Sequence, residues 1–268
     1  IVNSIYRLKA AETIDGTNRV LDYNDKSGEA YVWQTDENWD FIKDLSYSKA
    51  DDYYYYQIEK DFNIDLNNDD TIGLRFTTKE SSGVDHLLSD HLGGFHVKDE
   101  SEIIHDIRRN GRIVDSNYRL KAAETIDGIN RVLDYNEKSG EAYVWQTDEN
   151  WDFIKDLSYS RPDKESYAQI EKDFNVDLNN DDIIGLKFTT KESSGEDHLL
   201  GDHLGGFHVK DESGKIHDIK RNGRKVNSNW SKEFELIAAE TIDGTNRVLD
   251  HNDKSGEAYV WQTDENWD

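Results

Sequence analysis

Oxygen-bearing side chains at alternate positions form the stretch of this sequence best suited to chemistry. It reads Phe-Asn-Ile-Asp-Leu-Asn-Asn-Asp-Asp-Thr-Ile-Gly at 62–73 and returns with two changes at 174–185. Calcium takes about six to eight oxygen ligands in a tolerant geometry, so alternate carboxylate and amide groups on a tight turn can converge on one ion. The predicted calcium ligands are three side-chain oxygens and one backbone carbonyl in each loop: Asp65, Asn67, Asp69 and Thr71, then Asp177, Asn179, Asp181 and Ile183.

The stretch matches only the first half of an EF-hand loop. Asp70 stands at the sixth position, where glycine is expected, and Phe76 at the twelfth, where a bidentate Glu would stand. We expect Ile72 to be the inward apolar residue, and Asp70, Asp61 or water to supply the missing ligands. Calcium affinity should therefore be weak. The alternative is an Asx-turn that merely ends a helix.

Two tryptophans that bracket an acidic turn recur three times, at 33–40, 145–152 and 261–268. A sugar ring can stack on indole while Asp and Asn bind its hydroxyl groups, so a carbohydrate-binding platform is one reading. The candidate platform residues are Trp33, Trp39, Trp145 and Trp151. The other reading places both indoles in the core, because Trp is highly buried on average. The strand pattern around them favours the core.

The histidines are spaced too irregularly for a metal site. They recur in both copies as His86, His91, His96 and His105, then His198, His203, His208 and His217. Steps of five residues match neither one helix face nor one strand face, so we expect solvated strand positions and no transition metal. No nucleophile motif, phosphate loop or HExxH is present, and carboxylates are too frequent to identify a catalytic pair. We therefore assign no catalytic residues and no enzymatic activity, and a hydrolase is a distant third possibility.

One helix should deliver the chain into the loop, and strands should surround it. Apolar residues at Tyr55, Ile58 and Phe62 share one face of a helix predicted over 52–62. Turn dipeptides predict hairpins over 6–23, around Asp15-Gly16, and over 103–114, around Asn110-Gly111. Further strands are predicted at 29–35, 39–47, 74–78, 86–89 and 95–98. The fold class is a β-rich α+β module of short antiparallel strands with one helix.

Internal duplication dominates the organisation. Residues 1–112 align with 113–224 without a gap, and 18 of the 112 positions differ. We divide the chain into the tail of a preceding repeat (1–3), two repeats (4–115 and 116–227) and a partial third repeat (228–268). The chain is expected to be a window from a longer tandem array. Short linkers between repeats predict a fairly stiff string of units.

Composition narrows the partners. The net charge of −25 makes nucleic acid and anionic membrane surfaces poor partners. Divalent cations would reduce the electrostatic self-repulsion of so acidic a chain. No apolar run approaches the roughly 20 residues of a membrane helix. The absence of cysteine excludes disulfides, zinc–thiolate sites and a thiol nucleophile.

Several motifs in order resemble a known family. They are Ala-Glu-Thr-Ile-Asp-Gly-Thr-Asn-Arg-Val-Leu at 11–21, the Trp33–Trp39 turn, the loop at 62–73, and Glu80-x-x-Gly83 leading to Leu-Leu-x-Asp at 87–90. The pattern resembles the tryptophan-rich C-terminal repeat domain of large secreted cyanobacterial proteins and covers most of each unit. The family loop usually has glycine where Asn68 and Asp70 stand, and Tyr23 and Tyr135 replace a common Trp. The resemblance implies a calcium-associated, type I-secreted surface protein without an established enzymatic activity.

These observations predict a calcium-stabilised structural or adhesive repeat module of a large bacterial extracellular or cell-surface protein. Its partners would be neighbouring repeats or identical chains, in a filament or a matrix. A carbohydrate-binding module that takes polysaccharide is the alternative. Tandem repetition favours the structural role, because each unit adds length and each interface adds stability.

Overall fold

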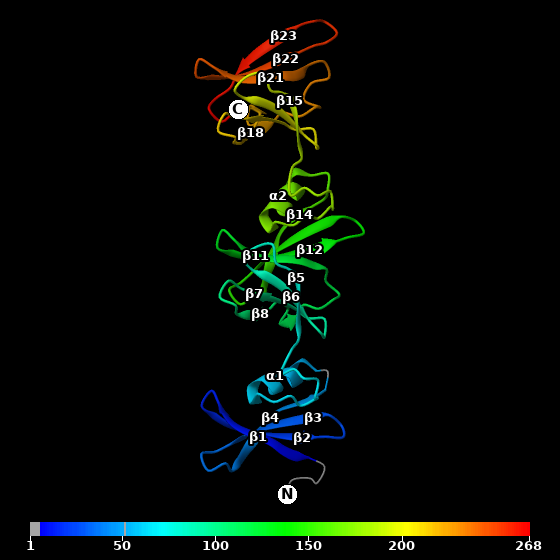
Figure 1. The fold of residues 1–268 in the computed structure, drawn as a ribbon, viewed down its shortest axis with the longest axis vertical. Helices are drawn as coiled ribbons and strands as arrows, with labels where there is room; N and C mark the ends of the chain where they lie inside the picture. Colours follow the sequence, from blue (N-terminus) through cyan, green and yellow to red (C-terminus); the bar gives the residue numbers. More distant parts are fainter. Residues whose placement is uncertain (1–5, 51) are drawn as a thin grey trace. The chain divides into compact units, whose positions relative to one another are not determined.

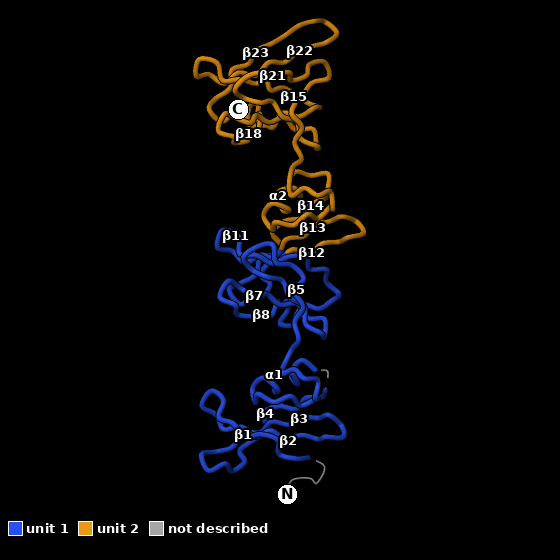
Figure 2. Tube along the Cα trace, in the orientation of Figure 1, with its two compact units in different colours: residues 1–132, 145–155 blue, residues 133–144, 156–268 orange. Residues whose placement is uncertain are grey.

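The computed structural model describes residues 6–50 and 52–268, so the tail assigned to 1–3 lies outside the described residues. Antiparallel strands dominate, together with two short helices (Figure 1). The predicted β-rich fold with one helix in each complete repeat is confirmed. The chain divides into two compact units, 1–132 with 145–155 and 133–144 with 156–268 (Figure 2).

The first copy opens with a four-stranded antiparallel sheet whose strands lie in sequence order. At its first turn, Asp15 and Gly16 have φ of 49° and 72°, the left-handed values that this two-residue hairpin requires. The sheet differs from the prediction at Trp39, which has φ of 66° and lies in the turn before the fourth strand. The strands are β1 (Arg7–Ile14), β2 (Thr17–Asn24), β3 (Glu29–Thr35) and β4 (Phe41–Lys49).

Helix α1 (Tyr53–Phe62) follows this sheet and packs its apolar face on it, as the spacing predicts. Ile58 and Phe62 share one buried cluster with Leu21 and Val32 of the sheet. The helix ends where Asn63 adopts φ of 51°, a left-handed cap that turns the chain into the candidate calcium loop. Helix α2 (Glu165–Phe174) has the same bounds relative to its repeat.

A second antiparallel sheet and a very short hairpin complete the repeat. The hairpin turns at Asn110 and Gly111, where the dipeptide predicts it. The sheet contains β5 (Phe76–Glu80), β6 (His86–Asp90), β7 (Phe95–Lys98) and β8 (Ile104–Asp106), and the hairpin contains β9 (Arg108–Arg109) and β10 (Arg112–Ile113).

The same elements recur in the remaining chain. The second copy contains β11 (Leu120–Ile126), β12 (Ile129–Asn136), β13 (Glu141–Thr147), β14 (Phe153–Ser160), β15 (Phe188–Glu192), β16 (His198–Asp202), β17 (Phe207–Lys210), β18 (Ile216–Asp218), β19 (Lys220–Arg221) and β20 (Arg224–Lys225). The third contains β21 (Glu235–Ile242), β22 (Thr245–His251) and β23 (Ala258–Gln262).

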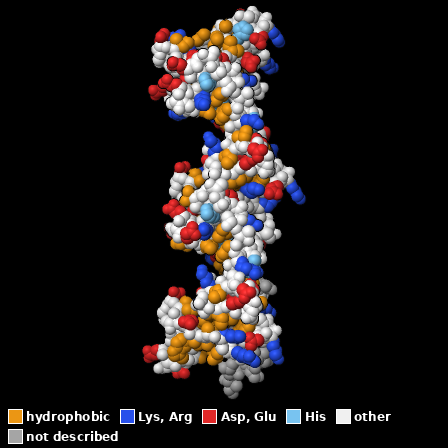
Figure 3. All heavy atoms as spheres, in the orientation of Figure 1, with side chains coloured by type: hydrophobic (Ala, Val, Ile, Leu, Met, Phe, Trp, Pro, Cys, Tyr) orange, Lys and Arg blue, Asp and Glu red, His pale blue; other side chains and the backbone are white. Residues whose placement is uncertain are grey.

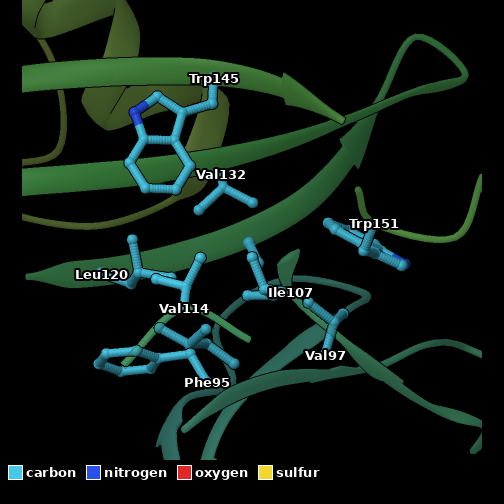
Figure 4. Close-up of a cluster of buried hydrophobic side chains, with 10 residues drawn as sticks. Phe95, Val97, Ile107, Val114, Leu120, Val132, Trp145 and Trp151 are labelled. Atoms are coloured by element: carbon cyan, nitrogen blue, oxygen red, sulfur yellow. The ribbon is translucent and has the colours of Figure 1, made fainter. Parts of the chain in front are cut away.

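The hydrophobic cores cross the boundaries between repeats. Val97 and Ile107, from the end of one repeat, pack with Val132, Trp145 and Trp151 of the next (Figure 4). A second core joins residues 199–226 to 236–267 in the same way. The unit that packs together therefore does not coincide with the sequence repeats divided at 115/116, because the β6–β8 layer covers the sheet that follows it in sequence. The sequence shows the period of the repeat but not where the packing unit begins, and only these long-range contacts show that.

The sheet of the first copy has no such cover among the described residues. Trp39 is 46% exposed there, whereas Trp151, at the same place in the next copy, is 2% exposed. Leu8 and Phe41 are exposed as well. Figure 3 shows hydrophobic atoms gathered over the part of the chain labelled β1 to β4 in Figure 1. Across 6–50 and 52–268, no helix has the length and apolar character needed to cross a membrane.

Candidate calcium loop and its buried support

The side chains predicted as calcium ligands organise the backbone of the loop. Asp65 accepts hydrogen bonds from the backbone N–H groups of Asp69, at 3.2 Å, and Asp70, at 2.9 Å. Asn67 Oδ1 accepts the Asp69 N–H at 3.0 Å, and Asp69 Oδ1 accepts the Thr71 N–H at 2.9 Å. Asp177, Asn179 and Asp181 make the same contacts in the second copy. Each of these oxygens has two lone pairs, so a bond from an N–H leaves one for a cation.

The loop bends through left-handed residues. Asn68 and Asp70 have φ of 56° and 64°, and Gly73 has φ of 83°. Asn and Asp tolerate this region better than other non-glycine residues, although glycine adopts it at lower cost. This explains why glycine suits the positions of Asn68 and Asp70 in the family that the sequence resembles. Asn and Asp preserve the turn in this chain.

Burial differs between neighbouring residues of the first loop. Asp65, Asn67, Asp69 and Thr71 are half-buried, whereas Asn68 and Asp70 are exposed. In the second loop Asp177 is half-buried, but Asn179 and Asp181 are exposed. All four predicted ligand residues of the first loop are thus partly shielded from solvent, and each can offer oxygen, the donor atom that calcium prefers.

Ile72 does not point inward, contrary to the prediction. It is 45% exposed, and Leu66 is the apolar loop residue that enters the core.

Glu59, on the apolar face of α1, supports the loop from below. Its carboxylate accepts the N–H groups of Leu66 at 2.9 Å, Asn67 at 3.4 Å and Gly73 at 3.1 Å, and the side chain is fully buried. Burial raises the pKa of Glu59 above its ordinary value, against the lowering effect of the three N–H donors. Glu171 repeats this arrangement with Leu178 and Gly185. The sequence signal was a Glu four residues after Tyr55, within the apolar stripe.

Residues near the loop add few ligands to the candidate calcium site. Arg75 lies 3.7 Å from Asp69 Oδ2, so it partly neutralises the loop. Phe76 packs edge-on against His96 and supplies no oxygen. Across the described residues, no group of three or more His, Asp or Glu side chains is arranged to hold a metal ion. A bound calcium would therefore need Asn67, a backbone carbonyl and water beside the two aspartates.

The tryptophans of the first and second copies differ in their exposure to solvent. Trp145 and Trp151 lie within the core, and the Arg109 guanidinium lies 4.8 Å from the centre of the Trp145 ring. Neither ring can stack on a sugar while that core is intact. Trp33 is half-buried and Trp39 is exposed. The carbohydrate alternative therefore stays a prediction for these two residues alone.

The prediction of solvated histidines is wrong for His96 and His208, which are buried. The His96 ring lies between Asp90, 2.9 Å from Nε2, and Asp106, 3.0 Å from Nδ1. Burial lowers the pKa of His96, but hydrogen bonds to Asp106 and Asp90 outweigh it and leave the pKa raised. When both ring nitrogens carry a proton, each can donate to one aspartate, so a protonated His96 links β6, β7 and β8. The aspartates come from neighbouring strands, which residue spacing did not reveal.

Solved structures match this chain only distantly. The solved structures that match this chain include "Dihydro-heme d1 dehydrogenase NirN in complex with DHE", at 10% identity over 96% of this chain and 47% of that chain, with a TM-score of 0.20. The periplasmic gluconolactonase PpgL of Pseudomonas aeruginosa matches at 10% identity over 93% of this chain and 68% of that chain, with a TM-score of 0.20. The GH43_1 enzyme of Xanthomonas citri, complexed with xylotriose, matches at 10% identity over 98% and 88%, with a TM-score of 0.19. Likenesses this distant carry no argument about function. No curated protein matches this chain.

The family comparison is specific. The model of the "Tryptophan-rich Synechocystis species C-terminal domain" matches three times, at residues 3–73, 85–185 and 198–268. The middle match begins with the β6–β8 layer and ends with the candidate loop. It therefore spans both the β6–β8 layer and the following sheet, which share one hydrophobic core. This tryptophan-rich, tandemly repeated chain therefore belongs to that domain family.

Proposed function

We propose that the chain is a calcium-stabilised structural repeat module of a large bacterial extracellular or cell-surface protein. The observation that carries the proposal is the core shared across the repeat boundary, where residues 87–114 and 120–151 bury one set of side chains. Such packing ties each repeat to its neighbour, and nearest-neighbour interfaces are what stabilise a tandem array. The role is mechanical or adhesive spacing, in a filament or a matrix.

Calcium supports this role in two ways. The alternate oxygens of the Asp65–Thr71 loop could hold an ion between the end of α1 and the segment that leads to β5. Ion binding would also offset the net charge of −25, whose self-repulsion disfavours the compact state. With few protein ligands, the expected dissociation constant is about 10⁻⁴–10⁻³ M, the range of extracellular calcium modules.

Calorimetry of the intact chain in calcium and in excess chelator tests the proposal. We expect the chelator to lower the melting temperature by several degrees. A variant with Asp65→Asn and Asp177→Asn should lose this dependence, whereas sodium at matched ionic strength should not replace calcium. Equal melting temperatures in calcium and in chelator would refute the calcium role.

A further inference from the structure

Two acidic side chains fasten the 80–85 segment to the edge of β11. Glu124 of β11 is 5% exposed, and its Oε2 accepts the N–H groups of Val84 at 3.2 Å and Asp85 at 3.4 Å. In return, buried Asp85 accepts the N–H of Thr125 at 2.8 Å through Oδ2. Side-chain carboxylates thus take the place of a backbone ladder at this edge.

Two carboxylate oxygens at this junction are buried and have no hydrogen-bond donor: Glu124 Oε1 and Glu80 Oε2. The other oxygen of Glu80 accepts both the N–H and the hydroxyl of Ser82. Burial of a polar atom without a partner destabilises the folded state, and more so when the atom is charged. Something must therefore compensate these two oxygens.

The surrounding charges do not compensate them. Glu80 and Asp85 face Glu124 from the segment, and both are acidic. On the neighbouring strand β12, the Arg131 guanidinium has the carboxylate of Asp127 at 4.0 Å. Close packing also limits the space, because a Cβ on Gly83 would lie 1.7 Å from Glu124 Oε1. A proton needs no additional room, unlike a hydrated cation.

The arrangement recurs in the next copy. Glu192 Oε2 is buried without a partner, Glu240 accepts the N–H of Asp197 at 3.4 Å, and Asp197 accepts the N–H of Thr241 at 2.8 Å. In the first copy the matching residue, Glu12, is exposed. Glu12 therefore provides a control with the same local sequence but without the junction.

We propose that Glu124 Oε1 carries a proton in the folded chain and donates it in a hydrogen bond to Glu80 Oε2, and that this proton holds the 80–85 segment on β11. The step is an acid–base equilibrium: hydroxide or buffer base removes the proton from the carboxylic acid of Glu124 and leaves its carboxylate. The inference does not rest on the calcium loop, which is formed by different residues.

Electrostatics sets the pH range of the junction. Burial, followed by the negative charges of Glu80 and Asp85, raises the pKa of Glu124 from an ordinary 4.5 to about 7. Because the folded state holds the proton more tightly than the unfolded state, the junction is strongest below pH 4.5. It weakens as the pH rises to about 7 and changes little beyond. The shift corresponds to at most about a 300-fold change in the closing equilibrium.

Amide hydrogen exchange on the intact chain, followed by NMR between pH 5 and 8.5, tests whether the Glu124 proton holds the segment. Protection factors correct for the intrinsic pH dependence of exchange. We expect protection of the Asp85 and Thr125 amides to fall by about 10- to 70-fold in the wild type over this range, because part of the change is already complete at pH 5. It should stay nearly constant in Glu124→Gln, whose amide donates to Glu80 without titrating. Glu12→Gln should behave like the wild type.

A second readout keeps the test independent of the folding of any one variant. The infrared spectrum at pH 6 should contain the carbonyl band of a protonated carboxyl group that is missing in Glu124→Gln. Protection that does not change with pH in the wild type would overturn the proposal, as would the absence of that band. Restoration of protection at pH 8.5 by calcium, in the wild type but not in Glu124→Gln, would overturn it in favour of a cation.

Discussion

Replacement of Trp151 by Ala, compared with the same change at Trp39, measures what the shared core contributes. Both residues lie in an identical Asp-Glu-Asn-Trp-Asp turn with similar left-handed φ, 63° and 66°, so the backbone effect of the substitution cancels. Trp151 is 2% exposed and packs in the core with Val97 and Ile107, whereas Trp39 is 46% exposed. The comparison therefore isolates the cover that residues 85–114 place over the next sheet.

The expected magnitudes differ clearly. Truncation of a fully buried Trp costs about 3–5 kcal/mol, because transfer and cavity terms add. A half-exposed Trp buries roughly 100 Å², which at about 25 cal/mol per Å² is worth at most about 2.5 kcal/mol. Amide exchange at Val97 reports the opening of the core of Trp151, and amide exchange at Leu21 reports the sheet of Trp39. Equal losses from the two substitutions, or a loss below about 1 kcal/mol for Trp151→Ala, would contradict the shared core.

Three further perturbations follow from the contacts described. Glu59→Ala leaves two buried N–H groups and one partly buried N–H group without this acceptor, so we expect a loss of about 2–4 kcal/mol by urea unfolding, with a smaller loss for Glu59→Gln. Gly83→Ala forces a Cβ into Glu124 Oε1, so it should destabilise the chain by about 1–3 kcal/mol and deprotect the Thr125 amide; normal protection would contradict that contact. The proton on His96 contributes stability that is fully present below the ordinary pKa of 6.5 and is lost as the pH rises through the raised folded value. Thermal unfolding of His96→Gln should therefore have a flatter pH dependence than the wild type above pH 6.5, and identical profiles would exclude this role.

Local chemistry made the hairpins and helices predictable. Asp15-Gly16 and Asn110-Gly111 need left-handed φ values that few other dipeptides supply, and both lie where the sequence places them. The apolar spacing of Tyr55, Ile58 and Phe62 likewise placed α1 to within one residue at its start. These signals depend on near neighbours, so a single sequence carries them.

Long-range packing accounts for the features that sequence reasoning missed. The burial of His96 depends on Asp90 and Asp106 from adjacent strands, and the burial of Glu124 depends on a segment some 40 residues earlier. The phase of the module was hidden for the same reason, because an exact repeat shows its period but not which halves pack together. Exposure of Ile72 could not be foreseen either, since the loop is anchored by Leu66 in the core and by hydrogen bonds to Glu59 of the preceding helix.

Isothermal titration of calcium into the intact chain tests the central claim most directly. The account predicts two bound ions per chain, one for each loop, with dissociation constants of about 10⁻⁴–10⁻³ M. Asp65→Asn should remove one ion, and the double variant with Asp177→Asn should remove both. An absence of binding in this range, or binding that both substitutions leave unchanged, would contradict it.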